Sequence, residues 1–156
     1  MESRWTEIEE VIRKFQAFLI PEVTPLKIQK GIDFSSDIKD IKFRKQCGEL
    51  TNRGVYLFFD ESESLRYVGC THLQALGGRI PQSISRLRKR RWTDIWEKLR
   101  WIDVIPFKDE WLFLAPALEN YLIDQEVFRG WNLLNKLGAS DRVLRGVVRG
   151  IRRNTS

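Results

Sequence analysis

Glu119 is the carboxylate whose position in the sequence most directly suggests chemistry. In a helix, a residue is a neighbour of the side chains three and four positions away. For Glu119 these are Ala115, Pro116, Leu122 and Ile123, which are all apolar. A carboxylate among apolar neighbours is costly to bury unless a cation or a hydrogen-bond donor compensates it. The sequence therefore predicts a divalent metal at Glu119, a salt bridge to an arginine, or a rim position that reaches water.

Basic side chains are concentrated in two segments, although the net charge of the chain is only +6. Residues 79–100 contain eight Lys and Arg against two acids, and residues 141–156 contain five Arg against one acid. The side chains expected to contact a polyanion are Arg86, Arg88, Lys89, Arg90 and Arg91 in the first segment and Arg142, Arg145, Arg149 and Arg152 in the second.

Nucleic acid is the partner that these two segments favour, because the arginine fork matches phosphate oxygens. The arginines of the second segment recur every three or four residues opposite an apolar face, which predicts an amphipathic helix. Two alternatives remain at this point. The basic side chains can form a solvated helix face without a ligand, or the last helix can lie on an anionic membrane.

Two triplets and three later residues form an ordered set. Ten residues separate the two tyrosines of the set, and its arginine follows the second triplet by ten positions. The members are Gly54-Val55-Tyr56, Tyr67-Val68-Gly69, Arg79, Glu119 and Asn135. With its strand–strand–helix context, this set resembles the GIY-YIG nuclease superfamily over about residues 51–138.

The resemblance implies hydrolysis of phosphodiester bonds in DNA with one divalent metal ion, Mg²⁺ or Mn²⁺. It implies that Glu119 binds the metal and that Tyr56 is the general base. Arg79 would clamp the phosphate, Tyr67 would position the phosphate or the water, and Asn135 would be a further site residue. A free tyrosine has a pKa near 10, so a tyrosine base needs positive charge nearby to serve at neutral pH.

Each of these residues also has a purely structural interpretation. The two tyrosines can be half-buried strand residues with their hydroxyls at a wet edge. Arg79 can be a surface cation, and Asn135 can cap a helix. The order and spacing of the whole set favour the catalytic interpretation.

Ser83 is the main departure from the family pattern. Many members carry His or Tyr one helical turn after the arginine, and Ser83 occupies that place here. A second hypothesis is therefore a nucleic-acid-binding protein that retains the nuclease fold without cleavage. His72, the only histidine, can contact phosphate or shuttle a proton, or it can be a solvated loop residue. Cys70 is expected to be a packed small residue.

Hydrophobic periodicity predicts the elements that position these residues. Thr6 and Glu9 have the spacing of a capping box at the start of the first helix. The expected strands cover residues 54–59, 65–69 and 101–107, and the first two should form a hairpin. The expected helices cover about residues 5–19, 36–45, 81–91 and 115–128, with a short one after Thr93 and a last one after residue 140.

The fold class expected from this order is α+β, with a small three-stranded, mainly antiparallel sheet flanked by helices. Residues 1–50 are expected to form an N-terminal helical extension, residues 51–138 the nuclease-like domain, and residues 139–156 a C-terminal basic helix packed on it. The length of 156 residues leaves little room for a separate recognition domain.

Composition excludes several other classes. Nine Phe, six Trp and three Tyr argue against a disordered chain, and two cysteines are too few for a disulfide framework. No signal peptide or membrane span is predicted, so the expected location is cytoplasmic, nucleoid-associated or nuclear, and not secreted. DNA is the expected partner, a homodimer is possible, and the choice among a restriction, a repair and a recombination role is left open.

Overall fold

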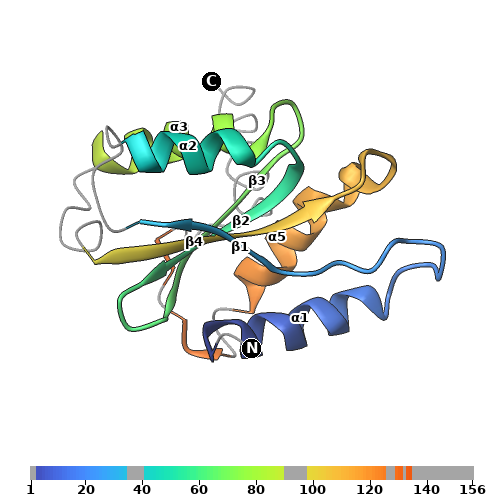
Figure 1. The fold of residues 1–156 in the computed structure, drawn as a ribbon. Coiled ribbons are helices and arrows are strands. Elements are labelled where there is room, and N and C mark those ends of the chain that lie inside the picture. The colour runs from blue at the N-terminus through green and yellow to red at the C-terminus, as the bar shows by residue number, and fades with distance from the viewer. Residues whose placement is uncertain (1–2, 35–40, 90–97, 126–128, 132, 135–156) are drawn as a thin grey trace, which may run out of the picture.

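The computed structural model describes residues 3–34, 41–89, 98–125, 129–131 and 133–134. The helices and strands are η1 (Ser3–Trp5), α1 (Thr6–Gln16), β1 (Gln29–Asp33), α2 (Ile41–Glu49), β2 (Arg53–Asp60), β3 (Leu65–Thr71), α3 (Leu76–Lys89), β4 (Leu99–Phe107), η2 (Asp109–Leu114) and α5 (Ala115–Asp124). They form an α+β fold with a four-stranded antiparallel sheet in the order β1-β4-β2-β3. Helices α2 and α3 cover one face of the sheet, and α1 and α5 cover the other (Figure 1).

The predicted three-stranded sheet is wrong, because β1 adds a fourth strand at the edge beside β4. The sequence of β1 buries only Ile32, so no alternation of apolar residues marks it as a strand. Gly31 permits the close pairing, since a Cβ at this position would lie 2.3 Å from the carbonyl oxygen of Ile102. Residues 1–50 thus contribute a strand to the common sheet in addition to α1 and α2.

The predicted hairpin of β2 and β3 is confirmed, and β2 also pairs with β4. Alternate side chains of a strand point to opposite faces of a sheet. Val55, Leu57 and Phe59 accordingly pack in the core with α1 and α5, whereas Tyr56 and Phe58 pack in the core with α2 and α3. The sheet therefore separates two apolar cores, and Tyr56 belongs to the α2–α3 side.

Helix α3 begins at Leu76, five residues before the predicted start at Pro81. The backbone amides of Leu76 and Gly77 donate hydrogen bonds to the carbonyl oxygens of Asn52 and Leu50. Contacts with distant segments therefore set the start of the helix. Pro81 lies inside α3, where its missing N–H removes one hydrogen bond of the helix.

The other elements follow the predictions with shifted ends. The predicted capping box is wrong, because α1 has Trp5 at its N-cap position with no side-chain cap bond. Helix α2 lies later than the predicted 36–45, and the strand predicted at 101–107 is confirmed with a start two residues earlier. Helix α5 contains Pro116 in its first turn, as predicted. The helices predicted after Thr93 and after residue 140 lie outside the described residues.

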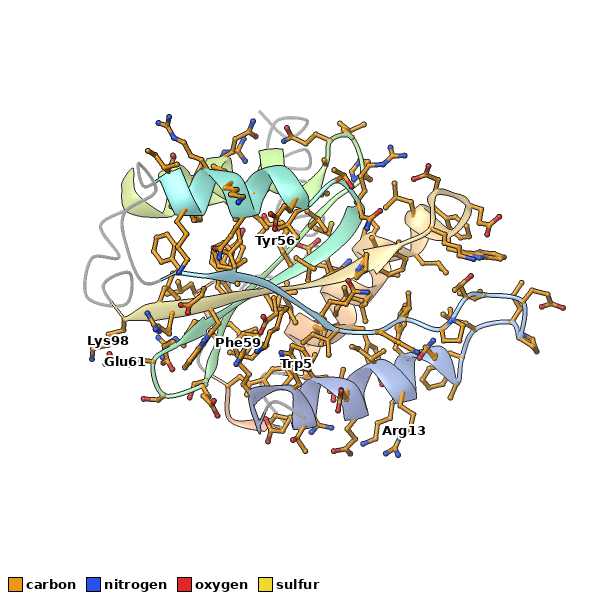
Figure 2. All side chains as sticks on the ribbon, in the orientation of Figure 1. Trp5, Arg13, Tyr56, Phe59, Glu61 and Lys98 are labelled. Atoms are coloured by element: carbon orange, nitrogen blue, oxygen red, sulfur yellow. The ribbon has the colours of Figure 1, made fainter. Side chains whose placement is uncertain are left out.

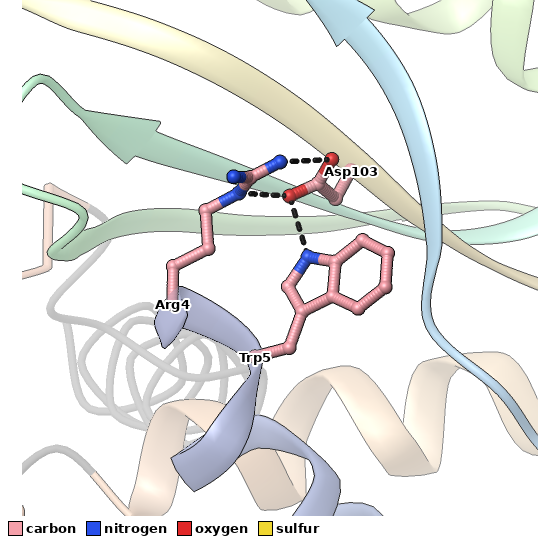
Figure 3. A network of polar contacts seen from close by, with 3 residues as sticks. All are labelled: Arg4, Trp5 and Asp103. Carbon is pink, nitrogen blue, oxygen red and sulfur yellow. Dashed lines mark hydrogen bonds and ion pairs between the residues drawn. The ribbon is translucent and has the colours of Figure 1, made fainter. Parts of the chain in front are cut away.

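Arg4 and Asp103 form a buried ion pair between η1 and the centre of the sheet (Figure 3). Arg4 Nε donates to Asp103 Oδ2 at 2.6 Å, and Arg4 Nη2 donates to Oδ1 at 3.2 Å. The indole N–H of Trp5 donates to the same carboxylate at 2.8 Å. The guanidinium carbon of Arg4 also lies 4.7 Å from the ring centre of Trp101. These contacts fasten the start of α1 to β4.

Candidate functional site

Tyr56 and Tyr67 come from neighbouring strands and lie together on the α2–α3 side of the sheet. Their ring centres are 6.1 Å apart, and the rings are stacked at 25°. Tyr56 pairs with Gly69 in the hairpin, and a Cβ at Gly69 would lie 2.3 Å from Cζ of Tyr56. The Tyr56 ring therefore occupies the space that a side chain at position 69 would need. In Figure 2, Tyr56 lies between the sheet and the α2–α3 layer, and only 1% of its surface is exposed.

Ser83 is the hydrogen-bond partner of the Tyr56 hydroxyl. The two side-chain oxygens are 2.5 Å apart, and Ser83 is buried on the inner side of α3. In the sequence, position 83 was notable only because the nuclease superfamily that the chain resembles often has His or Tyr there. Here the small hydroxyl fills that place and fixes the Tyr56 hydroxyl at the inner side of α3. No sequence pattern indicated this contact.

The pKa values of both tyrosines are raised by burial. For Tyr56, the hydrogen bond with Ser83, the charge and hydrogen bonding of Arg79 and the hydrogen bond with Tyr67 oppose part of this rise in pKa. For Tyr67, contact with Tyr56 and the negative charge of Glu119 raise the pKa further, and the charge of Arg79 lowers it. Arg79 thus acts on both phenols, and Glu119 acts on Tyr67. The structure brings these four predicted site residues into one electrostatic cluster.

Glu119 approaches this cluster from the opposite layer. It is half-buried on α5, and the thiol of Cys70 donates a hydrogen bond to its Oε2 at 3.0 Å. Tyr67 and Cys70 are three residues apart in β3, so their side chains point to opposite faces of the sheet. Because β3 is a terminal strand, groups from both faces can meet around its free edge. Cys70 is a packed residue, as predicted, and it also contacts the candidate metal ligand.

Glu119 offers a single carboxylate to a metal ion, with the Cys70 thiol beside it. Among the described residues, no group of three or more His, Cys, Asp or Glu side chains could hold a metal ion. This part of the chain therefore lacks the closed ligand cage of a structural metal site. Mg²⁺ commonly binds through one or two carboxylates, several waters and substrate phosphate oxygens. Glu119 can supply the carboxylate of such a site.

His72 and the basic segments are described only in part. His72 is exposed, and its carbonyl oxygen accepts a hydrogen bond of 3.0 Å from Arg53, which also binds Asp109. Arg86 is exposed on α3. Arg88 and Lys89 belong to the same helix, but their side chains are not described. Outside the described residues lie Arg90, Arg91, Asn135, Arg142, Arg145, Arg149 and Arg152.

Comparisons of the chain with protein-family models, curated proteins and solved structures found no match. Within the described part of the chain, no helix has both the length and the apolar character needed to cross a membrane.

Proposed function

We propose that this protein is a metal-dependent DNA endonuclease of the GIY-YIG type that hydrolyses phosphodiester bonds. The observation that carries the proposal is the cluster at β3. Arg79 from α3 and Glu119 from α5 act on a stacked pair of tyrosines from the β2–β3 hairpin. A cation, a carboxylate and two phenols beside the β2–β3 hairpin suit the binding and activation of a phosphodiester.

In this proposal, Tyr56 takes the proton of the attacking water and Arg79 binds the phosphate oxygens. The hydroxyl of Tyr67 positions the phosphate or the water. Glu119 would hold one Mg²⁺ or Mn²⁺ ion, and such an ion would supply stabilisation of negative charge on the phosphate and on the leaving oxygen. Ser83 and Arg79 both lower the pKa of Tyr56, which is the direction that a general base requires.

The second candidate is a nucleic-acid-binding protein that retains the nuclease fold without cleavage. One specific observation favours it: Tyr56 is almost fully buried, and burial raises its pKa. A base must release its proton and reach water, so both properties oppose catalysis unless substrate binding changes the surroundings of the hydroxyl. The two candidates differ in cleavage and agree in binding.

Cleavage of supercoiled plasmid DNA with Mg²⁺ or Mn²⁺ is the decisive experiment. Glu119→Gln and Tyr56→Phe should each lower the nicking rate at least a hundredfold and leave DNA affinity unchanged. Asp124→Asn, an exposed carboxylate on the same helix, and Tyr121→Phe are the matched controls and should retain the wild-type rate. Full nicking by both site variants would refute the assigned roles. Metal-independent binding without any nicking by the wild-type protein would establish the second candidate.

The Ser83→Ala variant separates a proton-transfer role of Tyr56 from a purely structural one. Ser83 lowers the pKa of Tyr56, so its removal should move the rising limb of the pH–rate profile to higher pH. A uniform loss of rate at all pH values would instead indicate a structural role.

A single site cuts one strand, so cleavage of both strands requires a homodimer or two successive binding events. Sedimentation velocity during binding to the DNA distinguishes these two routes.

A further inference from the structure

Charge is distributed unequally between the two helical layers. The sequences of α2 and α3 contain seven Lys and Arg and one acid, whereas those of α1 and α5 contain two Lys and Arg and five acids. Arg44 and Lys45 of α2 and Arg86 of α3 are exposed. Among these four helices, the basic residues are therefore concentrated on the same side of the sheet as Tyr56.

A groove of about 740 Å³ lies between α2 and α3, and Arg44 stands among its lining residues. Glycines form part of both walls: Gly48 on α2, and Gly77 and Gly78 on α3. Gly77 is needed for packing, because a Cβ there would lie 1.8 Å from the carbonyl oxygen of Cys47. Apart from its chain neighbours and the nearby helix backbone, no atom of the described residues lies within 4 Å of a Cβ built at Gly48.

Neither backbone conformation nor internal packing accounts for Gly48. Its φ lies outside the positive range that favours glycine, and the space beside it is open. Glycine inside a helix is less stable than alanine, so this residue weakens α2 without a benefit within the described structure. A close approach of another molecule to the helix backbone is a common reason for such a glycine.

We infer that the phosphate backbone of a nucleic acid lies across the outer side of the α2–α3 layer and passes over the groove at Gly48. This inference rests on the proposed function, and it places the substrate on a helix that precedes the segment resembling the nuclease family. The exposed cations Arg44, Lys45 and Arg86 neutralise the phosphates, which fixes position without reading sequence. Neighbouring residues of a helix point about 100° apart, so α3 presents Gly78 to the groove and Arg79 away from it. The groove and the tyrosine cluster therefore involve adjacent residues of α3, Gly78 and Arg79.

The salt dependence of DNA binding tests the basic surface. A fluorescently labelled duplex of about 20 base pairs is titrated with the full chain in EDTA, at salt concentrations between about 50 and 200 mM. Each lost phosphate contact should flatten the slope of log K against log salt by about 0.9. The triple variant Arg44→Gln, Lys45→Gln, Arg86→Gln should therefore flatten it by up to about 2.7.

The matched control is Arg13→Gln with Lys14→Gln. Both cations are exposed on α1, in the opposite layer, and Arg13 points away from the sheet (Figure 2). This double variant should keep the wild-type slope. An unchanged slope in the triple variant, or a flattened slope in the α1 control, would overturn the inference.

Substitutions at Gly48 test the groove itself. Gly48→Ala should raise the melting temperature and retain binding, because the methyl group is small and meets no atom of the protein. Gly48→Gln should also fold, but its longer side chain should project into the groove at the point of closest approach and weaken binding at least tenfold. Full affinity in Gly48→Gln would exclude the groove from the binding surface. Binding to phosphatidylserine vesicles without binding to the duplex would overturn the choice of nucleic acid.

These titrations are carried out without metal ions and therefore report on binding alone. Plasmid nicking with Mg²⁺ tests hydrolysis separately. If the wild-type protein nicks DNA but the triple variant keeps the wild-type salt slope, the proposed binding surface is refuted and the proposed function stands. If the salt slopes change as expected but the wild-type protein never nicks DNA, the proposed binding surface stands and the proposed cleavage is refuted.

Discussion

Asp103 should be among the most sensitive positions for stability, because its carboxylate is buried and accepts three hydrogen bonds from Arg4 and Trp5. Asp103→Ala removes all three and leaves a guanidinium with 3% of its side chain exposed and without its carboxylate. Breaking a buried ion pair by removing one partner costs about 3–5 kcal/mol. That is a large share of the roughly 5–15 kcal/mol that stabilises a typical domain.

Urea unfolding followed by tryptophan fluorescence measures this loss. With an m-value of about 2 kcal/mol/M, a loss of 4 kcal/mol shifts the midpoint by about 2 M. Lys14→Gln is the control, because the Lys14–Glu10 pair is about half exposed and should leave the midpoint unchanged within the error of the fit.

The double variant Arg4→Met, Asp103→Leu tests the physical reason for the loss. Replacing both members of a buried pair by apolar residues of similar size is often neutral or stabilising. The double variant should therefore recover most of the stability that Asp103→Ala loses, apart from the lost acceptor of Trp5. A loss below about 1 kcal/mol in Asp103→Ala, or a double variant as unstable as the single one, would refute the reasoning.

Three further predictions concern the described core. Gly69→Ala places a Cβ against the Tyr56 ring and should cost about 1–3 kcal/mol of unfolding free energy, seen as a lower urea midpoint; an unchanged midpoint would contradict the contact. Burial raises the pKa values of Tyr56 and Tyr67, so their contribution to stability is fully present below pH 10 and is lost as the pH rises above it. Unfolding midpoints between about pH 8 and 11 should therefore fall less steeply in a Tyr56→Phe, Tyr67→Phe variant than in the wild type. Burial raises the pKa of Cys47 to about 11, so in a Cys70→Ser variant its thiol should react with a disulfide reagent at pH 8 only after urea is added.

Local patterns in the sequence were sufficient to predict the β2–β3 hairpin. Two runs of β-branched and aromatic residues flank a polar turn, and this pattern is typical of antiparallel strands. The hairpin alone brings Tyr56 close to Tyr67. The apolar neighbours of Glu119 likewise predicted its partly buried position on α5.

Features that depend on distant contacts could not be predicted in this way. Strand β1 has one buried residue and is held by pairing with β4. The start of α3 is set by carbonyl groups of Leu50 and Asn52. Ser83 meets Tyr56 across 27 positions of the sequence, and Arg4 meets Asp103 across 99. No local propensity indicates such pairs, because they depend on how the layers stack.

The candidate site draws its members from both layers of the molecule, and this has a consequence for folding. Tyr56, Tyr67, Arg79 and Ser83 belong to the α2–α3 side, whereas Glu119 is carried by α5, a helix of ten residues on the other side. A short helix is marginal by itself and depends on its docking. Local opening of α5 would therefore remove the carboxylate while the tyrosine pair stays intact. The candidate site is complete only when folding is complete, so under the proposed function a partly folded chain would keep the tyrosines and Arg79 but lack the proposed metal ligand.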